Sequence, residues 1–401
     1  MNIIATKMKN NFLWIGITDC IYSVSRLFCD VFLIAYLLKV SKDNFANVGF
    51  YWLAVVSVTV ILSYLLKDYL KSGYELIIYR LGIISNFALF IWLYIMGDEV
   101  SKHIIATGVF TGLSMALRGL GRIFLTSKNV SDDNMIKFRG YIEVVKSSLR
   151  IVVPFLLGLF LMKNASFFQS LGIISVTLFI EYIFTYKIEA KRGDYKKANL
   201  NKFIYENKSD NVLKEAYKMD FFRGLTIQGI LPTTITLYSV YLFGDNFKLG
   251  VVTSFFCLCT LAVNFLFGKF CKYSKFVIIA KFTGCFSVFC ALLFVVLPNK
   301  VTFLIYNFSY VTIMQLIWLV TEVNMFNVAN LNQIKNNYKT EYFVVREFVL
   351  GIGKILGTLM LILIAMFKNI FFLHMFLLFL TVGMAIMNFY VVSLNKKLFS
   401  K

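Results

Sequence analysis

Charged side chains interrupt a long apolar stretch, residues 138–162, near its start. Glu143, Lys146 and Arg150 are spaced so that all three lie on one face of a helix, at ~100° per residue. The other positions are mostly Ile, Val, Leu and Phe. A carboxylate held beside a base in a low-dielectric interior takes up a proton when that base moves away. The stretch therefore predicts a membrane helix with a charged stripe inside the protein.

The same pattern returns in the second half of the chain, 204 residues later. Glu347 and Lys354 stand at this offset from Glu143 and Arg150, and they also open a long apolar run, residues 342–367. The recurrence predicts two similar halves, each of which hides a charged stripe.

Composition favours a membrane protein. Of 401 residues, 59% are hydrophobic and 15% are charged, and the mean hydropathy is +0.74. A helix needs ~20 apolar residues to cross the bilayer, and every backbone group in lipid must be paired internally. We therefore expect an all-α integral membrane protein of twelve transmembrane helices in two pseudo-symmetric six-helix halves. The expected spans are 12–38, 45–66, 75–97, 103–126, 139–162, 166–187, 221–243, 247–268, 275–297, 301–326, 342–367 and 370–394.

The long polar segment between the sixth and seventh spans divides the chain. We expect a six-helix bundle over 1–187, a basic cytoplasmic linker over 188–220 and a second bundle over 221–401. The net charge of +20 is read as the positive-inside rule rather than as nucleic-acid binding, because most Lys and Arg of the connections fall on the side that holds both ends. This predicts a monomeric multi-pass protein of the cell membrane with both termini in the cytoplasm.

The first span carries four polar residues on one face. Asp19, Ser23, Arg26 and Asp30 fall within about 40° of one another on the helix. Two interpretations stay open: a self-neutralising structural network, or the polar lining of a translocation path.

The fourth span contains Arg118 and Arg122 and no acid of its own. We expect their partners to be Glu143, Asp19 or Asp30, or an anionic substrate, because Arg binds carboxylate and phosphate in a two-pronged way. At the 204-residue offset, Arg118 corresponds to Glu322 in the tenth span. The candidate proton carriers are Asp19, Glu143, Glu322 and Glu347.

Other features are expected to be structural. Arg80 and Arg223 should reach the headgroups from helix ends, Glu181 should pair with a base or face a lateral opening, and Gly108 and Gly112, like Gly353 and Gly357, should mark close helix contacts. The chain has two His residues and no P-loop motif, so we expect no metal site, no cofactor and no enzyme activity.

Architecture and three partial motifs resemble the major facilitator superfamily. The segment from Tyr64 to Gly73 keeps the acid of the family's helix 2–3 loop motif at Asp68. The run Arg118-Gly-Leu-Gly121 is similar to the family's helix 4 motif, and Pro154 with Gly158 is similar to its helix 5 motif. The resemblance implies alternating access, in which two halves rock about a central site built from helices 1, 4, 7 and 10.

Three functions follow from these observations. The first is secondary active transport, coupled to protons, of a small anionic or amphipathic organic solute. The second is a lipid or glycolipid flippase on the same scaffold, and the third is a membrane sensor or assembly partner that transports nothing.

The residues expected to line the substrate and proton pathway are Asp19, Arg26, Asp30, Arg118, Arg122, Glu143, Lys146, Arg150, Glu322, Glu347 and Lys354, with Asp68 in a conformational loop.

Overall fold

Helices make up all the regular secondary structure among the residues that the structure describes. The computed structural model describes residues 2–41, 44–129, 132–162, 167–190, 193–243, 246–335, 337–367 and 370–399. The expected all-α fold is therefore confirmed.

The chain packs as two compact units. Unit 1 consists of residues 1–135 and 148–198, and unit 2 consists of residues 136–147 and 199–401. The helix α7, Asp132–Met162, contributes to both. Its charged stripe is divided in the same way, because Glu143 and Lys146 belong to unit 2 and Arg150 belongs to unit 1. The segment predicted as a linker, 188–220, is likewise shared between the two units.

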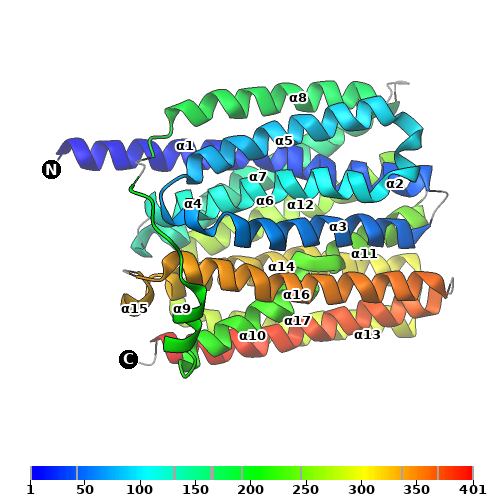
Figure 1. Cartoon of the computed structure of the whole chain (residues 1–401). Helices are drawn as coiled ribbons and strands as arrows, with labels where there is room; N and C mark the ends of the chain where they lie inside the picture. Colours follow the sequence, from blue (N-terminus) through cyan, green and yellow to red (C-terminus); the bar gives the residue numbers. More distant parts are fainter. Residues whose placement is uncertain are drawn as a thin grey trace. The chain divides into compact units, whose positions relative to one another are not determined.

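In unit 1, α6 packs against both α3 and α5, and α1 packs against α8 (Figure 1). Gly108 and Gly112 lie against the backbone of α3, where a Cβ atom would meet the carbonyl oxygens of Tyr51 and Val55 at 2.5 and 2.9 Å. The predicted close contact is confirmed. The helices are α1 Asn2–Leu27, α2 Ile34–Val40, α3 Phe45–Leu65, α4 Lys67–Lys71, α5 Glu75–Met96, α6 Ile104–Asn129 and α8 Phe167–Phe184.

In unit 2, α13 packs against α14 and α17, and α10 packs against α16 and α17. Gly353 and Gly357 of α16 face the backbone of α10, as predicted for a close helix contact. The helices are α9 Leu200–Glu206, α10 Asn211–Leu225, α11 Leu231–Phe243, α12 Asn246–Phe270, α13 Phe276–Val296, α14 Lys300–Ala329, α15 Asn332–Lys335, α16 Lys339–Met366 and α17 Ile370–Phe399.

Nine helical segments in the described part of the chain are long and apolar enough to cross a membrane. They coincide with nine of the twelve expected spans. The other three expected spans coincide with α7, with α10 and α11, and with α12, whose crossing of the membrane stays a prediction. The protein is thus a multi-pass helical membrane protein.

A widened turn interrupts one long helix in each unit. A π-helical segment, Phe28–Leu33, joins α1 to α2, and a second one, Thr226–Ile230, joins α10 to α11. The second segment includes Gly229, whose φ and ψ of −104° and −129° are not helical. Pro232 follows in α11 and has no backbone N–H to donate. Such π turns often mark functional positions in helices.

Candidate functional site

Among the described residues of unit 1, the most deeply buried charges belong to Arg118 of α6 and Glu181 of α8. Their ion pair joins Nη2 to Oε2, and both side chains are 0% exposed. The Tyr79 hydroxyl donates to Glu181 Oε1 at 2.7 Å, and Arg118 Nη1 donates to Ser25 Oγ at 3.1 Å. The guanidinium also lies over the Tyr22 ring, 4.0 Å from its centroid. Arg118 is therefore neutralised by an acid outside the expected set, because the folding of α8 brings Glu181 to it.

Close packing holds Arg118 in place. Gly82 of α5 faces it, and a Cβ atom at this position would lie 2.5 Å from Arg118 Cγ. The crossing of α5 and α6 therefore requires a glycine at residue 82.

The second arginine of α6 has one of the expected partners. Arg122 Nη1 donates to Asp19 Oδ1 at 3.0 Å, and the two side chains are 19% and 4% exposed. This pair links α6 to α1 inside unit 1.

A third pair in unit 1 is much more open. Arg26 Nε donates to Asp30 Oδ2 at 2.7 Å, and the two side chains are 35% and 36% exposed. Asp30 belongs to the π-helical segment that follows α1. Among the three Arg–acid pairs described here for unit 1, only this one presents a third of both side chains to the surroundings.

Unit 2 holds a larger buried network. Glu322 of α14 accepts from Arg223 Nη2 of α10 at 2.5 Å and pairs with Arg139 Nη2 of α7 at 3.4 Å. The guanidinium of Arg223 lies over the Trp318 ring, 4.9 Å from its centroid. Arg223 is 0% exposed, so the expectation that it reaches the headgroups is wrong. Its helix begins ten residues earlier than the expected span, which carries Arg223 into the packed interior.

The network continues to α16. Arg346 Nη2 lies 3.2 Å from Asp220 Oδ1, and Arg346 Nη1 donates to Glu347 Oε1 at 2.6 Å. Asp220 also lies 4.0 Å from Arg223 Nη1. Each guanidinium thus lies beside a carboxylate, and the formal charges of the six side chains cancel. These six are Arg139, Asp220, Arg223, Glu322, Arg346 and Glu347.

The charged stripe of α7 lies beside amide side chains. Lys146 Nζ donates to Glu143 Oε1 at 3.0 Å, and Gln315 Nε2 donates to Glu143 Oε2 at 3.4 Å. Asn264 of α12 donates to the Glu143 backbone carbonyl and to Ser147 Oγ, at 3.2 and 2.7 Å. Glu143 and Lys146 are both 4% exposed.

Arg150 and Lys354 are less buried than Glu143 and Lys146. Both are partly exposed. A Cβ atom at Gly229 would lie 3.8 Å from the Lys354 Cα atom, so Lys354 is beside the break between α10 and α11.

Asp68 anchors the start of the linker to unit 1. Its Oδ1 accepts from the Ala198 backbone N–H at 2.7 Å, and the Tyr195 hydroxyl donates to its Oδ2 at 3.5 Å. The charge of Asp68 raises the pKa of Tyr195 above its ordinary value. In unit 2, the Tyr338 hydroxyl donates to Glu206, and this hydrogen bond raises the pKa of Tyr338 to about 12.

Arg80 of α5 binds to Thr185, which follows the end of α8. Its Nε and Nη2 donate to the hydroxyl and the carbonyl of Thr185, at 2.9 and 3.0 Å. Its guanidinium lies over the Tyr186 ring, which is itself exposed.

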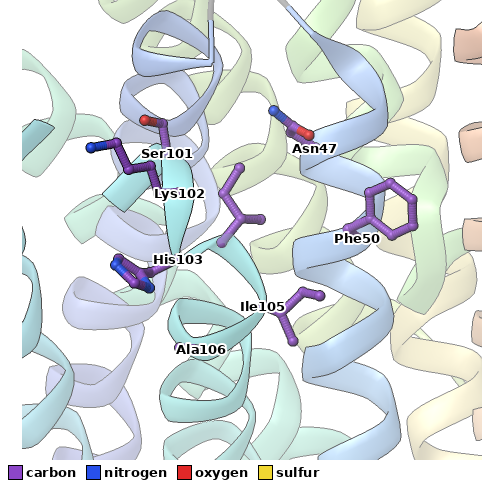
Figure 2. A pocket seen from close by; sticks show the side chains of 8 residues that line it. Asn47, Phe50, Ser101, Lys102, His103, Ile105 and Ala106 are labelled. Carbon is purple, nitrogen blue, oxygen red and sulfur yellow. The ribbon is translucent and has the colours of Figure 1, made fainter. Parts of the chain in front are cut away.

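A pocket of about 320 Å³ in unit 1 is lined by none of the residues of the three Arg–acid pairs. It opens between the beginning of α3 and the beginning of α6, and Figure 2 shows Asn47, Lys102 and His103 around it. Lys102 is engaged with Glu99 at 3.4 Å. None of the residues predicted for the transport pathway lines this pocket.

Several buried charges fell outside the expected pathway, although Glu181 was already expected to pair with a base or to face a lateral opening. Glu181, Asp220, Arg139 and Arg346 were not among the expected site residues, although each is a charge in or beside a long apolar run. That signal alone was sufficient to find them, because such charges are costly in lipid and need partners. No cluster of His, Cys, Asp and Glu in the described part of the chain could hold a metal ion.

No protein-family model matches the chain. A protein of Bacillus subtilis (strain 168), described as the uncharacterised protein YqgE, is 23% identical over 389 residues, which are 94% of this chain and 88% of that protein.

Two solved structures resemble the whole chain. The human organic anion transporter MFSD10 (TETRAN) superposes with a TM-score of 0.67 at 10% identity, over 96% of this chain and 99% of that one. A bacterial homologue of the iron transporter ferroportin, in an outward-facing state, superposes with a TM-score of 0.60 at 12% identity, over 98% of this chain and 100% of that one. The chain therefore has the major facilitator superfamily fold.

Proposed function

We propose that the protein is a secondary active transporter that works by alternating access. Its substrate is a small anionic or amphipathic organic solute, carried together with protons across the cell membrane. Both termini lie on the cytoplasmic side. The observation that carries the proposal is the open ion pair between Arg26 and Asp30.

The position of this pair in its span supports the proposal. The span that contains it, Asn11–Val40, has 30 residues, and Arg26 and Asp30 lie near its middle. About 20 residues cross the hydrocarbon core, so both side chains lie at the depth of the lipid tails. A charge there costs about 2.5–3.5 kcal/mol on insertion scales. Since a third of each side chain is exposed, we infer that the pair faces an aqueous path and not lipid.

The other arginines of unit 1 contribute differently. Arg118 is sealed against Glu181, and we assign this pair the role of holding α6 to α8. Arg122 and Asp19 are slightly more open, and we keep them on the edge of the path.

In unit 2, we propose that the pathway is lined by the two stripes that the repeat predicted. These are Glu143 and Lys146 on α7, whose stripe continues to Arg150 in unit 1, and Glu347 with Lys354 on α16. Glu322 joins them through its contacts with Arg139 and Arg223.

The fold supports transport, since one solved neighbour is an organic anion transporter and the other is a bacterial homologue of an iron transporter. The choice of an organic anion here rests on Arg26, whose guanidinium suits carboxylate, sulfonate or phosphate groups.

Flux in vesicles tests the proposal. The purified protein is reconstituted into liposomes, and uptake is measured for radiolabelled benzoate, toluenesulfonate and phenyl phosphate. We expect saturable uptake of at least one probe, lost in Arg26→Ala and kept in Lys102→Ala, a cation of unit 1 whose side chain is 71% exposed. Uptake no faster than in empty liposomes for all three probes would refute the proposed function.

A further inference from the structure

We infer that the Arg26–Asp30 pair couples anion and proton by exchange of partners, an inference that rests on the proposed transport function. A substrate anion replaces Asp30 on the Arg26 guanidinium, and the released Asp30 carboxylate binds one proton. One monovalent anion therefore travels with one proton, and the combined movement carries no net charge.

The geometry leaves room for a second anion on Arg26. The observed hydrogen bond uses only Arg26 Nε and Asp30 Oδ2. Among the described residues, the two Nη groups of Arg26 have no hydrogen-bond partner, and Asp30 Oδ1 has none either. A carboxylate or sulfonate binds best to two N–H groups of one guanidinium at once. An incoming anion can thus form two bonds where Asp30 makes one.

The surroundings leave Asp30 without a replacement cation. In the described part of the chain, Arg26 is the only base within salt-bridge distance of Asp30. Arg118 interacts electrostatically with Cys29, the neighbour of Asp30. The charge of Arg118 is already neutralised by Glu181. The other titratable groups around the pair are neutral in their ordinary state: Tyr22 of α1, Cys29 of the π-helical segment and Tyr51 of α3.

The proton follows from this arrangement. A carboxylate that loses its cation in a low-dielectric setting favours its protonated, neutral form. In the exchange, the N–H···O bond between Arg26 and Asp30 breaks, two N–H···O bonds form to the substrate, and a proton from the open side adds to the Asp30 carboxylate. When the anion leaves, Arg26 recovers Asp30, and the proton is released on the other side.

The helix is built to permit the movement. Asp30 lies in the π-helical segment Phe28–Leu33, whose widened turn departs from the regular α-helical hydrogen bonding on both sides of it. Asp30 can therefore move away from Arg26 by a local change in this segment, without unwinding of α1 or α2.

The test compares driven uptake with exchange, using toluenesulfonate, which stays ionised and does not leak across the bilayer as a neutral acid. In proteoliposomes with an inside-alkaline gradient of one pH unit, the wild type should accumulate the probe about tenfold. This is the ratio of the proton concentrations outside and inside, because each anion travels with one proton. An imposed potassium diffusion potential should leave this ratio unchanged.

Asp30→Asn should exchange labelled for unlabelled probe at about the wild-type rate but accumulate none. Glu99→Gln, which removes a carboxylate paired with Lys102 at the surface, should accumulate as the wild type does.

The outcomes separate this inference from the function on which it rests. Driven accumulation by Asp30→Asn would overturn the exchange while leaving transport intact, and so would a wild-type ratio that follows the membrane potential. Loss of both exchange and accumulation in a folded Asp30→Asn protein would also overturn it, because Asp30 would then be needed for binding. Absence of toluenesulfonate flux in the wild type, with uptake of another probe, would refute the exchange for a sulfonate, and absence of all flux would refute the transport function itself.

Discussion

Arg118 on α6 and Glu181 on α8 form an ion pair in which neither side chain exposes any surface. Breaking a buried pair by removal of one partner leaves an uncompensated charge, which costs about 3–5 kcal/mol. We expect Glu181→Ala to lower the melting temperature of the detergent-purified protein strongly. The double variant Arg118→Leu with Glu181→Leu should recover much of the loss, because no charge is left unpaired. A double variant as unstable as Glu181→Ala would show that the pair itself, and not the orphaned arginine, sets the cost.

Gly353 of α16 is predicted to tolerate no side chain. A Cβ atom there would lie 2.2 Å from the Phe221 carbonyl oxygen of α10, so the helices must move apart. We expect Gly353→Ala to destabilise the protein by about 1–3 kcal/mol, as overpacking does. The control is Gly119→Ala, where a Cβ atom meets nothing within 4 Å. Equal melting temperatures for the two variants would contradict the close approach of α10 and α16.

Glu322 should matter more for stability than Glu347. Glu322 pairs with two buried arginines, Arg223 and Arg139. Glu347 pairs only with Arg346 in the bonds described, and Arg346 keeps Asp220 when Glu347 is neutralised. Thermal unfolding of Glu322→Gln and Glu347→Gln checks this, and a lower melting temperature for Glu347→Gln would be inconsistent with the network as described.

Asp68 is expected to protect the linker from proteolysis. Its carboxylate holds the Ala198 backbone N–H at 2.7 Å, a hydrogen bond to a charged group worth about 1.5–3 kcal/mol. Loss of this hydrogen bond lowers the free energy needed to open the segment by the same amount. In Asp68→Ala, trypsin should therefore cut after Lys196 and Lys197 at least about tenfold faster. Asp194→Ala, an exposed acid of the same segment, provides the control. Unchanged cleavage in Asp68→Ala would mean that other contacts hold the linker.

The hydrogen bond between Tyr338 and Glu206 predicts a change of stability with pH. It raises the pKa of Tyr338 from 10.0 to about 12. Its stabilising contribution is therefore complete below pH 10 and disappears as the pH rises through 12. The difference in melting temperature between wild type and Tyr338→Phe should shrink across this window, whereas Tyr205→Phe, whose residue is 83% exposed, should parallel the wild type throughout. A constant difference for Tyr338→Phe would exclude this hydrogen bond as its source.

The sequence by itself determined the fold class and where the charges of this protein are concentrated. Long apolar runs have one solution in lipid, the helix, because each backbone group must find its partner locally. Charges within such runs must face the interior or an aqueous path, so Arg26, Asp30, Glu143 and Glu322 were identified before any contact was known. The close helix contacts at Gly108–Gly112 and Gly353–Gly357 were also predicted from the sequence, because small residues at this spacing allow helices to approach.

Only the tertiary structure decided which charge meets which. Arg118 pairs with Glu181, which is 63 residues away in sequence, and Arg223 pairs with Glu322, which is 99 residues away. No local spacing encodes such pairs, because they depend on how whole helices pack. Exposure is likewise a property of packing: Arg26 and Arg118 look alike in the sequence, yet one is 35% exposed and the other 0%. That difference, set by the neighbouring helices, separates the proposed transport site from a structural ion pair.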